Sequence, residues 1–362
     1  MDYDSEIKRL QDELRDTQYN KATEHHFGVV KARMAELRRR NEKRIAAKSG
    51  GKGFDVKRSG NATVVLLGFP SVGKSTLLNK LVGTKSKAAS YAFTTVSVIP
   101  GLLEYNHAKI QILDVPGIVH GAASGRGRGK EVLGVIRNCD AILVVVDAQH
   151  PEHYDALLRE VDEFNVRINQ ALPDVKVTKK EKGGIDLQST VKLSLDKETI
   201  KTVLHGLRIN NAEVIIREDI TVDQLIDVVE GNRSYIPALT AISKIDLVDK
   251  RTRERLIKNI KPDVVVSGET GEGIKTLKRK LYKKLRFMRI FMKEVRKKAD
   301  MDIPLIVRKG STVQQICEKV HRDLARKFKY ARIWGPTAKF DGQVIRDKKR
   351  ALQDQDVIEI HS

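Results

Sequence analysis

The chain has 362 residues, enough for about two or three domains with a substantial apolar core. Its 68 Lys and Arg against 47 Asp and Glu give a net charge of +21, which favours a polyanionic partner such as RNA unless the charge serves solubility alone. Cys139 and Cys317 lie too far apart in the sequence to indicate a disulfide framework or a metal site. No apolar run reaches membrane-spanning length, and the N-terminus does not resemble a signal peptide. We therefore expect a cytoplasmic protein with no membrane partner.

Residues 1–59 predict a helical hairpin followed by a basic linker. Apolar residues recur at spacings of three and four, first at Ile7, Leu10 and Leu14 and then at Val30, Met34 and Leu37. The arginine-rich stretch at 38–44 is either a solvated helix end or a segment that contacts phosphates.

The remainder predicts an α/β protein in which a mostly parallel sheet is covered by helices on both faces. Continuous apolar strands in 60–164 form the first part of this domain, and the sheet resumes in 236–289. Shorter, more polar segments in 165–235 predict an inserted α+β subdomain. Residues 290–362 predict a small unit of strands around a helix at 312–320, and we expect Trp334 in its core.

The loop after the first strand matches the pattern G-x-x-x-x-G-K-[ST]: Gly68-Phe69-Pro70-Ser71-Val72-Gly73-Lys74-Ser75, followed by Thr76 in a predicted helix. Between a strand and a helix, such a loop holds polyphosphate with its backbone N–H groups and the helix dipole. We expect Lys74 to reach the β- and γ-phosphates and Ser75 to bind Mg²⁺. A chance glycine-rich turn is the alternative interpretation.

A second motif, Asp114-Val115-Pro116-Gly117, comes 40 residues after Lys74, at the end of another predicted strand. We expect Asp114 to bind Mg²⁺ through water, and the Gly117 N–H to sense the γ-phosphate. Ile118 follows the motif.

Two further motifs predict that the base is guanine. Ser243-Lys244-Ile245-Asp246 is similar to N-K-x-D, in which the carboxylate accepts N1–H and the exocyclic amine of guanine and the lysine stem covers the base. Ser243 replaces the usual Asn, which puts the affinity and the hold on neighbouring loops in doubt, more than the choice of guanine. Ser267-Gly268-Glu269 follows a short apolar strand and resembles the loop whose backbone contacts the guanine oxygen.

With these motifs in order, the sequence resembles the developmentally regulated GTP-binding proteins, a branch of the Obg-related P-loop GTPases. The resemblance also covers Tyr91-Ala92-Phe93-Thr94-Thr95, the glycine-rich 121–129 and Lys182-Gly183-Gly184-Ile185, and 290–362 resembles a ubiquitin-like TGS domain of the β-grasp type. It implies a regulatory GTPase that hydrolyses GTP to GDP and phosphate and associates with the ribosome or rRNA in translation, with a stabilising partner protein as a further candidate.

The family's residue roles transfer onto matching positions. Thr95, or Thr94, would be the switch threonine on Mg²⁺, so the metal set is Ser75, Thr95 and Asp114, and the catalytic set is Lys74, Thr95 and Gly117. Ile118 stands where many GTPases have a water-positioning Gln, so hydrolysis would be slow unless K⁺, the ribosome or a partner stimulates it. Relatives that use K⁺ often carry Asn where this chain has Ser71.

Two alternatives remain. The first is an RNA- or ribosome-binding adaptor in which GTP is structural, and the second is an Obg-related ATPase.

Overall fold

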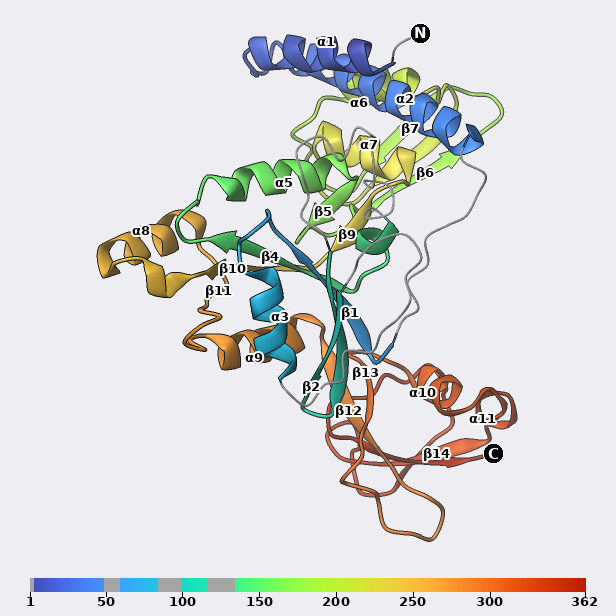
Figure 1. Ribbon diagram of the computed structural model, residues 1–362. Coiled ribbons are helices and arrows are strands. Elements are labelled where there is room, and N and C mark those ends of the chain that lie inside the picture. Colours follow the sequence, from blue (N-terminus) through green and yellow to red (C-terminus); the bar gives the residue numbers. More distant parts are fainter. Residues whose placement is uncertain (1–2, 49–58, 84–98, 116–133) are drawn as a thin grey trace. The chain divides into compact units, whose positions relative to one another are not determined.

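The computed structural model describes residues 3–48, 59–83, 99–115 and 134–362 (Figure 1). The chain forms two compact units that are interleaved in sequence. The first unit combines Met1–Phe54 with Val161–Tyr235, and the second combines Asp55–Glu160 with Ile236–Ser362.

The second unit contains a six-stranded sheet with strand order β11-β10-β4-β1-β3-β2. Five strands run parallel to one another: β1 (Ala62–Leu67), β3 (Ala108–Asp114), β4 (Ala141–Asp147), β10 (Ala238–Ser243) and β11 (Val264–Val265). The edge strand β2 (Ile99–Tyr105) is antiparallel to β3. All residues of β1 and β4 are buried, as expected for a parallel sheet covered on both faces.

Helices α3 (Lys74–Val82) and α9 (Ile274–Lys284) pack in one core with alternate residues of these strands. Helix α8 (Lys250–Ile260) places Leu256 against Ile242, in a separate cluster. Helix α5 (His153–Glu163) follows β4, and the short 3₁₀ helix η2 (Ile245–Leu247) follows β10.

The first unit joins the N-terminal hairpin to the inserted segment. The hairpin consists of α1 (Tyr3–Asp16) and α2 (Glu24–Lys48). The inserted segment has a three-stranded sheet of order β6-β8-β7, two helices and a two-stranded β5-β9 pair. Their bounds are β5 (Val166–Ile168), β6 (Val175–Lys179), β7 (Ile185–Ser189), α6 (Lys197–Gly206), β8 (Ala212–Ile216), α7 (Val222–Glu230) and β9 (Ser234–Ile236).

Helix α2 packs closely on α6, because small residues line the contact. Ala32 is fully buried in the same core as Val203 and Leu204, and a Cβ at Gly28 would lie 3.0 Å from a methyl group of Val203. The apolar residues predicted for this hairpin, among them Leu10, Val30 and Met34, form a separate cluster between α1 and α2. A second face of α2, made of small residues, therefore completes the core of the inserted segment.

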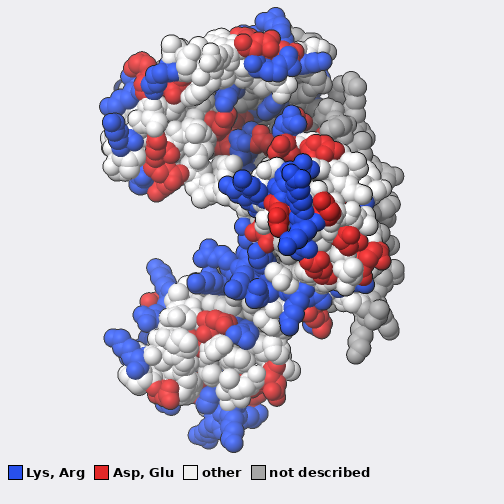
Figure 2. Space-filling view, turned by 90° about the vertical axis from the view of Figure 1, so that its left-hand side faces the viewer, with Lys and Arg blue, Asp and Glu red and all other residues white. Residues whose placement is uncertain are grey.

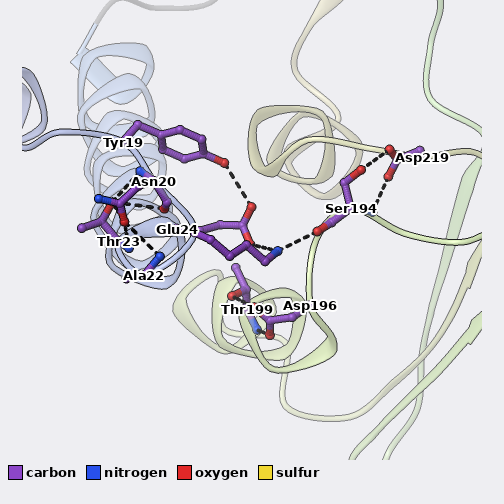
Figure 3. A network of polar contacts seen from close by, with 10 residues as sticks. Tyr19, Asn20, Ala22, Thr23, Glu24, Ser194, Asp196, Thr199 and Asp219 are labelled. Carbon is purple, nitrogen blue, oxygen red and sulfur yellow. Dashed lines mark hydrogen bonds and ion pairs between the residues drawn. The ribbon is translucent and has the colours of Figure 1, made fainter.

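Polar contacts also tie the α1–α2 turn to the insert (Figure 3). The Asn20 side chain accepts hydrogen bonds from the N–H groups of Ala22 and Thr23, at 2.9 and 3.0 Å. The ammonium of Lys21 contacts a Glu24 carboxylate oxygen at 2.6 Å and the Ser194 carbonyl at 2.8 Å. These hydrogen bonds join the turn between α1 and α2 to the inserted segment within the first unit.

The C-terminal part of the second unit is a five-stranded sheet of order β13-β12-β16-β14-β15. Its strands are β12 (Phe287–Met292), β13 (Leu305–Arg308), β14 (Tyr330–Trp334), β15 (Gln343–Ile345) and β16 (Val357–His361), and α10 (Val313–Val320) and α11 (Arg322–Lys327) connect β13 to β14. Thr312 begins α10 with a capping box to Gln315. This arrangement confirms the predicted α/β class with a β-rich C-terminal domain.

Trp334 differs from expectation. It is half-buried and lies outside the apolar cluster that α10 forms with the sheet, because it faces the opposite side of β14 from Ala331 and Ile333. In the described parts of the chain, no helix has the length and apolar character needed to cross a membrane.

Candidate functional site

Four sequence motifs meet at one edge of the six-stranded sheet. Parallel strands end on the same side, and the register pairs Leu66 with Asp114 and Asp147 with Ser243. Strand β11 is parallel to β10, with Ile242 opposite Val265, so the loops after β1, β3, β10 and β11 begin at one edge, with the end of β4 between them. This is the edge where α/β sheets commonly bind ligands.

The loop between β1 and α3 has the backbone that a phosphate loop requires. Ser71 and Gly73 both adopt positive φ angles, of 63° and 89°. A Cβ at Gly68 would lie 2.5 Å from the Val145 carbonyl oxygen, so only glycine allows this loop to pass against β4. Gly73 then precedes the first turn of α3, whose N–H groups point toward the loop.

Lys74 is a buried cation in this loop, with 8% of its surface exposed. Its Nζ donates to the carbonyl oxygens of Gly68 at 3.0 Å and Phe69 at 2.9 Å. Burial lowers the pKa of Lys74, and the nearby charge of Asp114 opposes this shift. No carboxylate in the described part of the chain forms an ion pair with Lys74, so an anionic ligand would supply the charge that the site lacks.

Two oxygen-bearing side chains meet beside Lys74. The Ser75 hydroxyl donates to Oδ2 of Asp114 at 2.6 Å, and Asp114 is buried at the end of β3. A hydroxyl and a carboxylate are hard oxygen ligands of the kind that Mg²⁺ prefers. The other predicted residues of this region, Thr94, Thr95, Pro116, Gly117 and Ile118, lie outside the described residues, as does the glycine-rich segment 121–129.

Ser243 connects the end of β10 to the phosphate loop. Its hydroxyl is buried, 2.7 Å from the Val72 carbonyl and 3.1 Å from the Val146 carbonyl. A hydroxyl has one proton, and the shorter distance favours donation to Val72. The side chain that replaces the usual Asn is therefore long enough to contact the phosphate loop directly.

Lys244 and Asp246 lie on either side of a sharp turn. Lys244 has a left-handed backbone, with φ of 55°, and its Nζ contacts Oδ2 of Asp147 at 2.7 Å. Asp147, buried at the end of β4, also accepts the N–H of Gln149. Asp246 is exposed, so its carboxylate is accessible to a ligand.

The loop at 267–269 closes the same edge. Ser267 is fully buried, and its Oγ accepts the N–H of Thr270 at 3.0 Å. The Val266 N–H donates to the Ile242 carbonyl at 2.8 Å, which joins this loop to β10. A Cβ at Gly268 would lie 2.8 Å from the methyl group of Thr76, so the loop reaches the start of α3.

Sequence reasoning missed two residues beside these loops. Asp147 ends an almost wholly apolar strand, and that position was the available signal for its pairing with Lys244. His153 packs on Phe69 of the phosphate loop, with ring centroids 4.5 Å apart, and has no comparable signal in the sequence.

Three family models match successive parts of the chain. The 50S ribosome-binding GTPase model matches residues 63–180, a model of the C-terminal region of that domain matches 182–287, and the TGS domain model matches 288–362. These ranges cover the six-stranded sheet, the insert and the C-terminal sheet.

Curated relatives match along nearly the whole chain. An uncharacterized GTP-binding protein of Methanocaldococcus jannaschii is 49% identical over 99% of this chain and 93% of its own length. Developmentally-regulated G-protein 3 of Arabidopsis thaliana is 43% identical over 98% and 97% of the two chains. Human developmentally-regulated GTP-binding protein 2 is 41% identical over 98% of each. The chain therefore belongs to the developmentally regulated GTP-binding proteins, a family of GTPases with a C-terminal TGS domain.

Proposed function

We propose that this GTPase binds GTP in the loops at the carboxyl edge of its six-stranded sheet and acts as a nucleotide-dependent switch for a ribosomal partner. The observation that carries the proposal is Lys74, a buried cation whose contacts are backbone carbonyls. A nucleotide phosphate would give this ammonium a charged partner and would also accept the N–H groups at the start of α3.

Ser75 and Asp114 are the proposed metal residues, with Thr95 as a third. When Mg²⁺ is bound, it neutralises charge on the β- and γ-phosphates and so favours transfer of the phosphoryl group to water. Ser75 would turn its hydroxyl from Asp114 toward the metal, and Asp114 would stay in place, because it is held at the end of a buried strand.

Base selection falls to Asp246 in this proposal. Its exposed carboxylate would accept both guanine donors, a pair that adenine does not present. Lys244 would lie along the base with its ammonium held by Asp147, and Ser267–Glu269 would offer backbone N–H groups to the guanine oxygen.

Turnover would depend on groups from outside the chain. Ile118 cannot orient a water molecule through a side-chain hydrogen bond, so we expect slow hydrolysis that K⁺, the ribosome or a partner protein accelerates. The 68 Lys and Arg residues favour rRNA as the contact on the ribosome, and a cytoplasmic location follows from that role. Binding of the γ-phosphate would order the segments around Thr95 and Gly117, and its release would free them.

The test measures GDP and GTP binding, and then phosphate release in K⁺ and Na⁺ buffers with and without ribosomes. Lys74→Ala should abolish hydrolysis, whereas the matched variant Lys109→Ala should not, because Lys109 lies at the start of β3, the opposite end of the sheet from the phosphate loop. Failure to bind guanine nucleotides, or wild-type turnover in Lys74→Ala, would contradict the proposal. Tight GTP binding without turnover under any condition would instead support an adaptor role.

A further inference from the structure

The C-terminal sheet has one face that its own helices leave uncovered. Residues from β12, β14, β15 and β16 alternate, so that Met288, Ile290, Ala331 and Ile333 face the core with α10. On the opposite face, Phe287 and Ile306 pack against the core of the six-stranded sheet. The remainder of that face belongs to β14, β15, β16 and the end of β12.

This open part carries aromatic and cationic side chains in a regular pattern. Tyr330, Arg332 and Trp334 occupy alternate positions of β14, which places neighbours ~7 Å apart. His361 of β16 lies directly opposite Tyr330, and the two rings are stacked, with centroids 4.3 Å apart and an interplanar angle of 12°. Arg332 is exposed between them and Trp334.

A buried carboxylate fixes these side chains in position. Glu359 contacts His361 at 2.7 Å and also accepts a hydrogen bond from Lys293, whose ammonium lies 4.8 Å from the centre of the Trp334 ring. Burial would raise the pKa of Glu359, but its bonds to Lys293 and His361 lower it, so the carboxylate remains charged. Rings held in this way lose little conformational freedom when a ligand binds.

The surrounding charge indicates an anionic ligand. Residues 288–362 contain 18 Lys and Arg against 10 Asp and Glu. Figure 2 shows Lys and Arg side chains distributed over the visible face of the molecule. Flat aromatic rings add a preference for a ligand with flat apolar faces, which bases of unpaired nucleic acid present and acidic peptides do not.

We propose that the face formed by Tyr330, Arg332, Trp334 and His361 binds unpaired bases of single-stranded RNA. Bases would stack on the Tyr330–His361 pair and beside Trp334, and Arg332 would contact the phosphate backbone between them. This proposal deepens the proposed ribosomal role by assigning an RNA surface, and its test needs neither nucleotide nor ribosomes.

Trp334 is the only tryptophan of the chain, so its fluorescence reports on this face in the unmodified protein. The full-length protein is titrated with a single-stranded RNA of about 12 nucleotides, with the same RNA as a duplex, and with inorganic polyphosphate. We expect the single strand to quench Trp334, and the duplex and polyphosphate to leave its emission nearly unchanged.

Substitutions separate the contribution of aromatic stacking to RNA binding from the contribution of positive charge. Tyr330→Ala should weaken single-strand binding on the order of tenfold, as expected for the loss of one base–aromatic stack, and Tyr330→Phe should retain it. Arg332→Ala should weaken binding more than Arg326→Ala, which removes the same charge from exposed α11 in the same domain.

Three outcomes would overturn the proposal: binding of the single strand without quenching, equal quenching by the duplex or polyphosphate, and equal losses in Arg332→Ala and Arg326→Ala. A protein that binds no RNA but still binds GTP would also overturn it, while leaving the nucleotide site intact.

Discussion

Replacing Ser243 by Ala tests whether one hydroxyl couples the base-reading loop to the phosphate loop. The substitution removes the donor that lies 2.7 Å from the Val72 carbonyl and changes no charge. Ala occupies less volume than Ser, and the rest of β10 keeps its pairing with β4. The variant therefore isolates the contribution of a single buried hydrogen bond.

The expected magnitude follows from burial. Val72 is 2% exposed, so its carbonyl would lose a partner where water has poor access, a loss that costs about 1–3 kcal/mol. If about 1.4 kcal/mol of this stabilises the binding-competent loop, the equilibrium constant between that loop and its other conformations falls about tenfold. The dissociation constant for GDP then rises by up to the same factor, because affinity scales with the competent fraction.

The assay is calorimetric titration with GDP, together with urea unfolding of the free protein. Ser243→Thr keeps the hydroxyl and should retain most of the affinity. Thr63→Ala is the comparison for a lost buried hydroxyl bond, because Thr63 donates to Gln111 at 3.2 Å near the start of β1, away from the phosphate loop, and it should leave GDP affinity unchanged. Wild-type GDP affinity and unfolding in Ser243→Ala would refute the coupling.

Other substitutions probe the scaffold and the buried thiols. Gly68→Ala should abolish nucleotide binding, because its Cβ would lie 2.5 Å from the Val145 carbonyl; titration with GDP measures this. Asp227→Ala should destabilise the first unit by up to about 3–5 kcal/mol in urea unfolding, because it removes the buried carboxylate that Arg167 and Arg233 share and leaves them only the more exposed Asp162. Burial raises the pKa of the Cys139 thiol to about 12, so the folded protein should resist alkylation at pH 8.5 until it unfolds. Because the thiol ionises at lower pH in the unfolded chain than in the folded one, its contribution to stability is fully present below about pH 8.5 and is lost as the pH rises toward 12. Wild type should therefore lose more stability than Cys139→Ala above about pH 9.

Local patterns predict the elements of the site well. Continuous apolar runs mark β1, β3 and β4, and each motif follows its strand directly, so the shared edge of the sheet can be inferred before any contact is known. The positive φ angle at Gly73 likewise follows from the glycine that the motif requires.

The contacts between motifs could not be predicted from the sequence. Ser243 and Val72 are 171 residues apart, and Lys244 and Asp147 are 97 apart, so no local pattern links them. Helical periodicity predicts the apolar face that α2 buries against α1, but it does not reveal the second face, with Gly28 and Ala32, that packs on α6. The prediction that Trp334 lies in the core is wrong for a similar reason. A large apolar ring favours burial, but the alternation of side chains along β14 decides which face of the sheet the ring occupies.

The interleaving of the two units has a consequence for synthesis. A nascent chain that has reached residue 160 already contains α1, α2 and the first strands of the nucleotide-binding sheet. The apolar face of α2 then has no insert to cover it, and β4 lacks its neighbour β10. Helix α1 can already pack on one face of α2, but the α2 face that packs on α6 stays uncovered until about residue 235 has emerged. The sheet of the second unit must wait longer still. For much of its translation this protein therefore presents two incomplete cores, and fragments truncated between 54 and 235 are expected to require chaperones or to aggregate.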